Sequence, residues 1–168
     1  MIHCWWWDTI PYFDYNGKRI FYEATKPNVK NALIFIHGSG GSSIAWRHQL
    51  ELDLDYSIIA VDLPSHGKSD PFPHLSLDLY VDVVKTLKDN LELERVILAG
   101  HSLGGAIIQD FYFKYPNAVY ALILIGTGGR LRVSPTILNA LKSDYNSFLQ
   151  ALPAGAFYRK TSREVIQS

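Results

Sequence analysis

The sequence predicts an α/β fold in which helices cover both faces of a mostly parallel sheet. First, continuous apolar runs, such as residues 32–36 and 96–99, are typical of strands that are buried on both sides. Second, these runs alternate with stretches of helical periodicity, which indicates right-handed crossovers between parallel strands. A chain of 168 residues is also long enough to bury one sizeable core.

The expected elements start with a hairpin and then alternate. Asn16-Gly17 separates two apolar runs, which is a strong signal for a tight turn between antiparallel strands. Ser76 is predicted to cap a helix, and Pro116 to close off the helix that begins near Leu103. In chain order we expect strands at 12–14, 19–22 and 32–36, a short helical stretch at 44–52, a strand at 57–61, a helix after 76 with Leu79, Val83, Leu87 and Leu91 on its apolar face, a strand at 96–99, a helix from 103 and a strand at 119–125.

The character of the sequence changes at residue 130. Two or three helical stretches follow, within 135–152 and from Thr161 onward, with no new strand between them. We therefore expect residues 1–129 to form the N-terminal part of the core, and residues 130–168 to begin a helical cap or lid. The final helical stretch stops after about two turns, so we expect the chain to be a fragment that is incomplete at its C-terminus.

Composition narrows the classes of protein to consider. Hydrophobic residues make up 48% and charged residues 19% of the sequence, which is typical of a globular domain rather than a disordered one. The 16 basic residues are balanced by 16 acidic ones, so we expect no nucleic-acid partner, since such binders carry a concentrated basic excess. The single cysteine, Cys4, excludes an intrachain disulfide, and no Cys/His cluster has the spacing of a metal site.

The apolar segments predict no targeting signal and no membrane span. The three tryptophans at 5–7 are too few for a signal-peptide core, have no basic flank before them and stop at Asp8. No apolar run approaches the roughly 20 residues that cross a bilayer. We therefore expect a cytoplasmic protein.

One motif carries chemistry. Gly100-His101-Ser102-Leu103-Gly104 is a G-x-S-x-G sequence that lies directly after a predicted strand and directly before a predicted helix. In that context it predicts a nucleophile elbow, a turn so sharp that the serine is exposed in a strained backbone conformation. Glycines are expected on either side because side chains there would collide. The alternative interpretation is a helix N-terminus that keeps its glycines for packing.

With three further segments, this motif resembles the α/β-hydrolase family over about residues 12–129. Residues 37–41, His-Gly-Ser-Gly-Gly, resemble the family's oxyanion loop, and residues 118–126 resemble the strand after the elbow. Residues 62–69 resemble the family's Asp-x-Pro-Gly-His-Gly-x-Ser segment, with Ser65 where glycine is usual. A serine at position 102 argues against the dehalogenase and epoxide-hydrolase branches, which use aspartate.

The resemblance implies acyl transfer on a small-molecule ester without a cofactor or metal. Ser102 would be the nucleophile, and the main-chain N–H groups of Leu103 and Ser39 would form the oxyanion hole. The residues expected to contact the substrate are Gly38, Trp46 and His101. A carboxylesterase or lipase-like enzyme fits best, although thioesterases, lactonases, peptidases and cofactor-free haloperoxidases share the motif.

The acid and base of a serine triad are the missing part. In the family they follow the nucleophile in the chain, but none of the six histidines follows Ser102. His101 is its neighbour, but adjacent side chains diverge in a tight turn. The other histidines with an expected place are His37 and His66, which should shape loops, and His48 and His74, which should lie on the surface. We therefore expect this chain alone to lack triad-assisted catalysis, and the missing part to come from a second chain or a swapped oligomer.

Other readings of the glycine-rich segments fail or stay open. A phosphate-binding loop would end in Gly67-Lys68-Ser69, but Asp62 replaces its first glycine. A dinucleotide-binding motif that starts at Gly38 fails because it would need glycine at Ser43. A non-catalytic protein of the same fold that binds a ligand or partner stays open as the alternative to a serine hydrolase.

Overall fold

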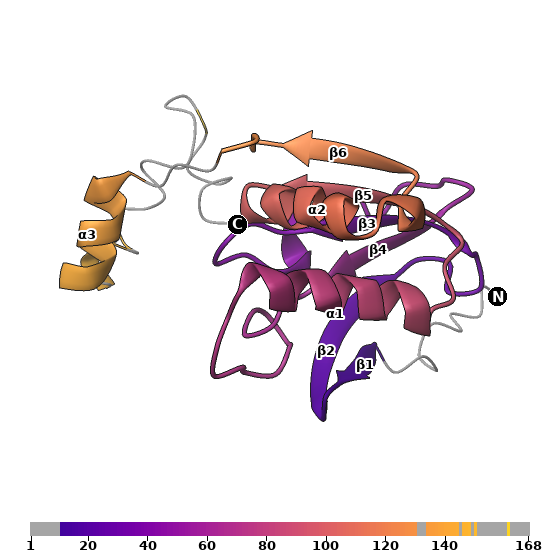
Figure 1. The fold of residues 1–168 in the computed structure, drawn as a ribbon, viewed down its shortest axis with the longest axis horizontal. Coiled ribbons are helices and arrows are strands. Elements are labelled where there is room, and N and C mark those ends of the chain that lie inside the picture. The colour runs from indigo at the N-terminus through magenta and orange to yellow at the C-terminus, as the bar shows by residue number, and fades with distance from the viewer. Residues whose placement is uncertain (1–10, 131–133, 145, 149, 151–160, 162–168) are drawn as a thin grey trace. The chain divides into compact units, whose positions relative to one another are not determined.

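Six strands form one mixed sheet in the order β1-β2-β4-β3-β5-β6 (Figure 1). The computed structural model describes residues 11–130, 134–144, 146–148, 150 and 161. Contacts between residues divide the chain into two compact units, Met1–Leu131 and Arg132–Ser168, and the sheet belongs to the first. The strands are β1 (Tyr12–Tyr15), β2 (Lys18–Ala24), β3 (Asn31–Ile36), β4 (Ser57–Val61), β5 (Arg95–His101) and β6 (Ala121–Ile125).

Four of the six strands are parallel. β3 pairs in parallel with β4 and β5, and β6 continues the parallel set beyond β5. β1 and β2 form the expected antiparallel hairpin, which joins the sheet through β4. Its turn places Asn16 at φ 54° and Gly17 at φ 78°, the left-handed pair that a two-residue hairpin turn requires.

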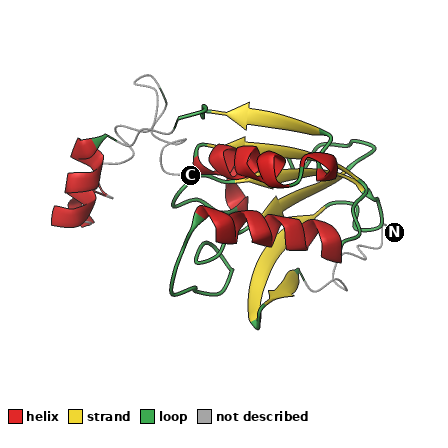
Figure 2. Cartoon of the chain, in the orientation of Figure 1, coloured by secondary structure: helices red, strands yellow, loops and turns green. Residues whose placement is uncertain are grey.

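Two helices, α1 (Leu77–Asn90) and α2 (Leu103–Lys114), lie on one face of the sheet (Figures 1 and 2). Ser76 caps α1 as predicted, because its hydroxyl accepts a hydrogen bond from the N–H of Leu79 at 3.1 Å. α2 ends two residues before Pro116, which begins the short 3₁₀ helix η2 (Pro116–Ala118). The sequence therefore predicted both helices, the cap at the start of α1 and the proline after the end of α2.

The core has one layer on each side of the sheet. Along β3, Ile34 and Ile36 pack toward the helices, whereas Phe35 belongs to a second cluster on the opposite face. On that opposite face lies the 3₁₀ helix η1 (Ser43–Trp46). The second cluster consists of Phe35, Trp46, Ile58, Ala60 and Ala99. Burial on both sides explains why the central strands are continuous apolar runs, and the predicted fold class is confirmed.

Three local expectations need correction. The helical stretch predicted at 44–52 is only η1 followed by turns, in which the N–H groups of both Gln49 and Leu50 share the carbonyl of Trp46. β6 begins at Ala121 rather than at 119, although the N–H of Tyr120 already bonds to the carbonyl of Val96 at 2.7 Å. The third correction is one of degree: Leu79 on α1 and Leu91 just after it pack against the core as predicted, but they are only partly buried. The buried residues of α1 are Tyr80, Val81, Val83, Val84 and Leu87.

The second unit contains α3 (Pro135–Ser143). Ser134 caps it by accepting a hydrogen bond from the N–H of Thr136 at 3.3 Å, and Pro135 occupies its first position. The other predicted helical stretches, including the one that starts at Thr161, lie mostly outside the described residues, and a cap role for this unit stays a prediction. None of the helices in the described ranges is long and apolar enough to cross a membrane.

Candidate active site

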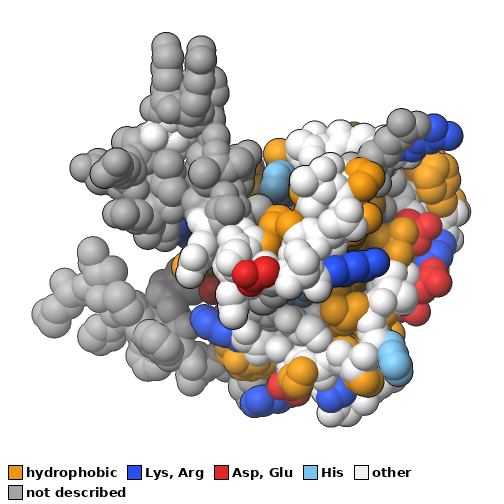
Figure 3. All heavy atoms as spheres, turned by 90° about the vertical axis from the view of Figure 1, so that its left-hand side faces the viewer, with side chains coloured by type: hydrophobic (Ala, Val, Ile, Leu, Met, Phe, Trp, Pro, Cys, Tyr) orange, Lys and Arg blue, Asp and Glu red, His pale blue; other side chains and the backbone are white. Residues whose placement is uncertain are grey.

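The segments that carry the candidate site meet where the parallel strands end. His37 follows β3, Asp62 follows β4, Ser102 follows β5 and Gly126 follows β6, so all four lie at the carboxyl edge of the sheet. Ligands of open α/β sheets bind outside this edge. Figure 3 views the molecule from this side, and the part not covered by grey atoms carries basic, acidic and hydrophobic side chains together.

The turn between β5 and α2 holds Ser102 in a strained conformation. Its backbone has φ 52° and ψ −110°, a combination that L-residues rarely adopt. The N–H of Ser102 donates to the carbonyl of Ile125 at 3.0 Å, and its carbonyl accepts from the N–H of Gly105 at 3.0 Å. The strained residue is thus fixed between the end of β6 and the first turn of α2.

Close packing explains the glycines of the motif. A Cβ on Gly100 would overlap the main chain of Gly104, as the sequence predicts. A Cβ on Gly104 would instead overlap the carbonyl oxygen of Ile36 at the end of β3. One on Gly105 would overlap the side chain of Thr127. The first turn of α2 therefore lies directly against the ends of β3 and β6, which requires glycine at all three positions.

The glycine-rich loop after β3 reaches the elbow. A Cβ built on Gly38 would lie 3.3 Å from the Cβ of Ser102 and 2.9 Å from Nδ1 of His101. Within the described part of the chain, the main-chain N–H groups of Ser39 and Leu103 are paired with no acceptor. Leu103 begins α2, where N–H groups have no partner inside the helix and the helix dipole favours negative charge.

His37 is a structural histidine. The ring is buried, its Nδ1–H donates to the carbonyl of Gly38 at 2.7 Å, and Nε2 accepts from the N–H of Leu63 at 3.1 Å. Burial lowers the pKa of His37, with a smaller opposing effect from the Gly38 carbonyl. His66 is also held at both nitrogens, by the carbonyl of Pro64 and the N–H of Gly40. Both histidines shape loops, as expected.

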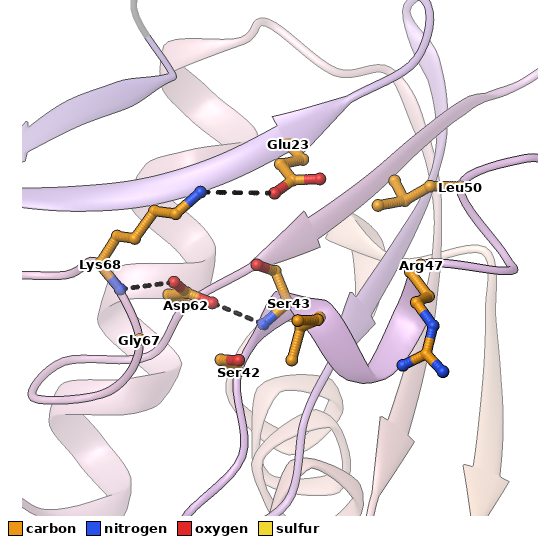
Figure 4. Close-up of a pocket in the computed structure, with 9 residues that line it drawn as sticks. Glu23, Ser42, Ser43, Arg47, Leu50, Asp62, Gly67 and Lys68 are labelled. Carbon is orange, nitrogen blue, oxygen red and sulfur yellow. Dashed lines mark hydrogen bonds and ion pairs between the residues drawn. The ribbon is translucent and has the colours of Figure 1, made fainter. Parts of the chain in front are cut away.

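Asp62, for which the sequence predicted no role in the site, connects two loops. It is buried, and its two carboxylate oxygens accept hydrogen bonds from the N–H groups of Ser43 at 2.5 Å and Lys68 at 2.7 Å (Figure 4). A hollow of about 240 Å³ adjoins it. The hollow is lined by Glu23, Ser42, Ser43, Ile44, Arg47, Leu50, Asp62, Gly67 and Lys68. The available sequence signal was the spacing of an aspartate at the end of a strand and a glycine five residues later.

Trp46 and His101, both expected to contact the substrate, differ in their burial. Trp46 is only 8% exposed and packs on Phe35 with ring centroids 4.8 Å apart, inside the second core cluster. Its Nε1–H has no acceptor among the described residues. This placement gives Trp46 a packing role in the core. The predicted contact between Trp46 and a substrate has no support from this packing. His101 is exposed beside the elbow, with its ring near Gly38 and Gly126, and its contact with a substrate stays a prediction.

The described residues bring no acid–base pair to Ser102. His37 and His66 use both ring nitrogens within their loops. His48 and His74 are exposed, as predicted. Over the same part of the chain, no group of three or more histidine, cysteine or acidic residues is arranged to hold a metal ion.

Comparison with known proteins identifies relatives across most of the chain. Residues 33–166 match the profile of the alpha/beta hydrolase family. An uncharacterized protein of Mycobacterium tuberculosis is 38% identical over 100 residues, which are 58% of this chain and 29% of that protein. A 2-hydroxy-6-oxononadienedioate/2-hydroxy-6-oxononatrienedioate hydrolase of Paraburkholderia phymatum is 33% identical over 133 residues, 74% of this chain and 46% of that protein. Epoxide hydrolase 4 of Homo sapiens is 31% identical over 143 residues, 80% of this chain and 40% of that protein.

A solved structure of similar fold supports the same family. A thermophilic esterase superposes with a TM-score of 0.79 at 31% sequence identity, over 93% of this chain and 58% of that chain. The chain thus spans less than half the length of the curated relatives named above and 58% of this esterase.

Proposed function

The chain belongs to the alpha/beta hydrolase family, and from this premise we propose that it is a serine hydrolase that acts on carboxylic esters through an acyl-enzyme at Ser102. The observation that carries the proposal is the backbone of Ser102, strained at φ 52° in the turn between β5 and α2. Strain of this kind persists where the surrounding structure enforces it, and it is common at active sites. A protein that only binds a ligand has no need of it.

The chemistry follows from the groups around Ser102. Its hydroxyl oxygen attacks the ester carbonyl carbon while a base removes the hydroxyl proton, and the carbonyl oxygen becomes an oxyanion. The free N–H groups of Leu103 and Ser39 stabilise this oxyanion. Collapse breaks the bond to the alcohol, which leaves with the proton, and water then hydrolyses the acyl-enzyme.

We also propose that the base and its acid partner come from outside these 168 residues. His37 and His66 are unsuitable because both ring nitrogens of each are already hydrogen-bonded. His48 and His74 are exposed on other segments, and no histidine follows Ser102 in the sequence. The isolated chain is therefore expected to be inactive or nearly so.

The relatives support ester chemistry to different degrees. The thermophilic esterase, at 31% identity, is consistent with the proposal. The relatives named as an epoxide hydrolase and a dienedioate hydrolase show that the family includes other substrates. The serine at position 102 favours an acyl-enzyme over epoxide chemistry. The cap, the small-molecule partner and a cytoplasmic location are part of the same proposal.

A small external base tests the proposal. The purified chain is treated with a fluorophosphonate probe with and without imidazole, which can replace a missing histidine, and the intact mass is measured. We expect no labelling without imidazole, slow labelling with it, and none in Ser102→Ala under either condition.

Each outcome is informative. Labelling that needs both imidazole and Ser102 supports the nucleophile and the external base. Labelling without imidazole would contradict the external base, and would place a functional base within this chain. No labelling of Ser102 with imidazole would contradict the nucleophile and favour the non-catalytic binding protein.

A further inference from the structure

We propose that Asp62 is a positioning residue that holds the loop of residues 37–43 against Ser102. Its catalytic meaning rests on the function proposed above, because this loop carries the Ser39 N–H that would stabilise the oxyanion. Asp62 itself is not expected to touch a substrate, because it is buried. It acts through the main chain of the loop.

Two adjacent residues fix both ends of this loop. At its start, Nε2 of His37 accepts a hydrogen bond from the N–H of Leu63 at 3.1 Å. At its end, a carboxylate oxygen of Asp62 accepts from the N–H of Ser43 at 2.5 Å (Figure 4). Because Asp62 and Leu63 are neighbours at the end of β4, one rigid strand end sets the distance between the two ends of the loop.

The loop needs such fixation because of its composition. Gly38, Gly40 and Gly41 lie within it, and Gly40 adopts a left-handed φ of 73°. Glycine has the largest conformational freedom in the unfolded chain and has no side chain to pack. Between its two ends, the loop is shaped by the bond from the N–H of Gly41 to the carbonyl of Gly38, at 3.1 Å, and by the bond from the N–H of Gly40 to Nε2 of His66, at 3.3 Å.

Asp62 is itself held on its other side. Its second carboxylate oxygen accepts from the N–H of Lys68 at 2.7 Å, and a Cβ on Gly67 would overlap the carboxylate. Its carbonyl accepts from the hydroxyl of Ser69 at 2.6 Å, and this hydroxyl in turn accepts from the N–H of Phe21 on β2. The carboxylate therefore has little freedom to move, and its hydrogen bond fixes the position of the Ser43 N–H.

The bond to Ser43 is of a strong type. A carboxylate that accepts from a main-chain N–H forms a charge-assisted hydrogen bond, which is roughly twice as strong as a neutral one. Burial strengthens it further because water does not compete. An asparagine at this position can accept from only one of the two N–H groups, since its amide nitrogen is a donor.

Hydrogen exchange tests the positioning directly. We expect the hydrogen-bonded main-chain N–H groups of Gly40, Gly41 and Ser43 to exchange about 10-fold faster or more in Asp62→Asn than in the wild type. A factor of ten corresponds to about 1.4 kcal/mol of local stability. Gly67→Ala, which displaces the carboxylate without removing it, should act in the same direction. Urea unfolding of each variant separates loop opening from a loss of global stability.

Two control variants separate positioning from general destabilisation. Asp70→Asn removes a carboxylate that also accepts a main-chain hydrogen bond, from the N–H of Arg19 at 2.8 Å, but outside this loop. Ser43→Ala changes the side chain and keeps the N–H that Asp62 binds. Neither should speed exchange in the loop.

The second readout is the imidazole-dependent labelling of Ser102. If the loop supplies an oxyanion donor, Asp62→Asn should lower the maximal labelling rate by about 10-fold or more and leave the concentration of probe at half-maximal rate unchanged, since loss of one donor costs about 10²–10³. Asp70→Asn should label like the wild type.

The outcomes distinguish this proposal from the proposed function. Unchanged exchange of the loop in Asp62→Asn, or equal acceleration in Asp70→Asn, would overturn the positioning role. Faster exchange with unchanged labelling would overturn its catalytic meaning. If the wild type is not labelled even with imidazole, the proposed function fails, and the exchange comparison alone then decides whether Asp62 holds the loop.

Discussion

Two serines at the same edge of the sheet have left-handed backbones, but they are held there in different ways. Ser65 lies in the loop after β4 at φ 64°, and Ser102 lies in the turn after β5 at φ 52°. The hydroxyl of Ser65 accepts a hydrogen bond from the N–H of Phe72 at 2.8 Å, so the side chain stabilises its own loop. The hydroxyl of Ser102 bonds to no residue in the described ranges, and close packing around Gly100, Gly104 and Gly105 holds the turn.

This difference separates a structural serine from a reactive one. At Ser65 the hydroxyl forms the hydrogen bond that offsets the backbone strain, so this hydroxyl is not available for chemistry. Where neighbours enforce the strain through packing, the hydroxyl stays free, as at Ser102. The loop after β4 should therefore be sensitive to lost hydrogen bonds, and the elbow to added volume.

The largest effect is expected from added volume at the elbow. In Gly104→Ala the new methyl group would overlap the carbonyl oxygen of Ile36, and main-chain atoms of a strand cannot easily move away. We expect a loss of about 3 kcal/mol or more in the free energy of unfolding, at the upper end of overpacking effects, measured by urea unfolding. Gly128→Ala is the control, because nothing lies within 4 Å of its Cβ position, and it should change stability by less than about 0.5 kcal/mol. Similar losses in both variants would show that packing does not hold the turn.

A smaller effect should separate the two serines. Ser65→Ala loses the bond to the N–H of Phe72 and keeps the strained backbone, so we expect a loss of about 1 kcal/mol in the free energy of unfolding. Ser102→Ala loses no hydrogen bond to a described residue and should change stability by less than about 0.5 kcal/mol. Ser65→Gly loses the same bond but relieves about 1 kcal/mol of strain, and should match the wild type. Equal stability of Ser65→Ala and Ser65→Gly would contradict the strain at this position.

The smallest expected effect is a pH dependence of the loop after β3. Burial lowers the pKa of His37, so below its ordinary value of about 6.5 the unfolded chain binds a proton that the folded chain refuses. The contribution of neutral His37 to the free energy of unfolding is therefore complete above about pH 6.5. It declines as the pH falls toward the pKa of His37 in the folded chain. The titratable groups that face the ring are His66, with ring centroids 5.0 Å apart, and Asp62.

Urea unfolding at several pH values between about 7.5 and 5 measures this slope. His37→Gln should lower stability at every pH and flatten the slope, whereas the exposed His74→Gln should leave the slope unchanged. A slope that survives in His37→Gln would assign the pH dependence to another group. The elbow, which is held by packing, should not contribute.

Much of the fold could be predicted because its signals are local. Asn16-Gly17 marks the hairpin turn, Ser76 caps α1, and the strand, G-x-S-x-G and helix order locates Ser102 at the end of β5. Where a local signal was ambiguous, the prediction was less accurate. Residues 44–52 were expected to form a helix, but they form only the end of η1 followed by turns, and Trp46 is buried in the second core cluster.

The candidate site was predictable only in part. The sequence pointed to Ser102 and to the loop around Gly38, and the two do lie side by side. It did not reveal that Trp46 is buried on the opposite face of the sheet, because an aromatic residue after a loop has no periodicity that assigns it a side. Nor did it assign a role to Asp62, whose partners are Ser43 in the loop after β3 and Lys68 further along its own loop.

The sequence by itself determined the α/β fold, the place of the elbow and the absence of a histidine after Ser102, because periodicity, turn residues and residue counts depend only on neighbours along the chain. The tertiary structure decided why Gly104 must be a glycine, which histidines are occupied, and what holds the loop of residues 37–43. These depend on atoms brought together from β3, β4 and β5. Only the folded sheet places the three strand ends at one edge, where a carboxylate on one loop can bind the main chain of the next.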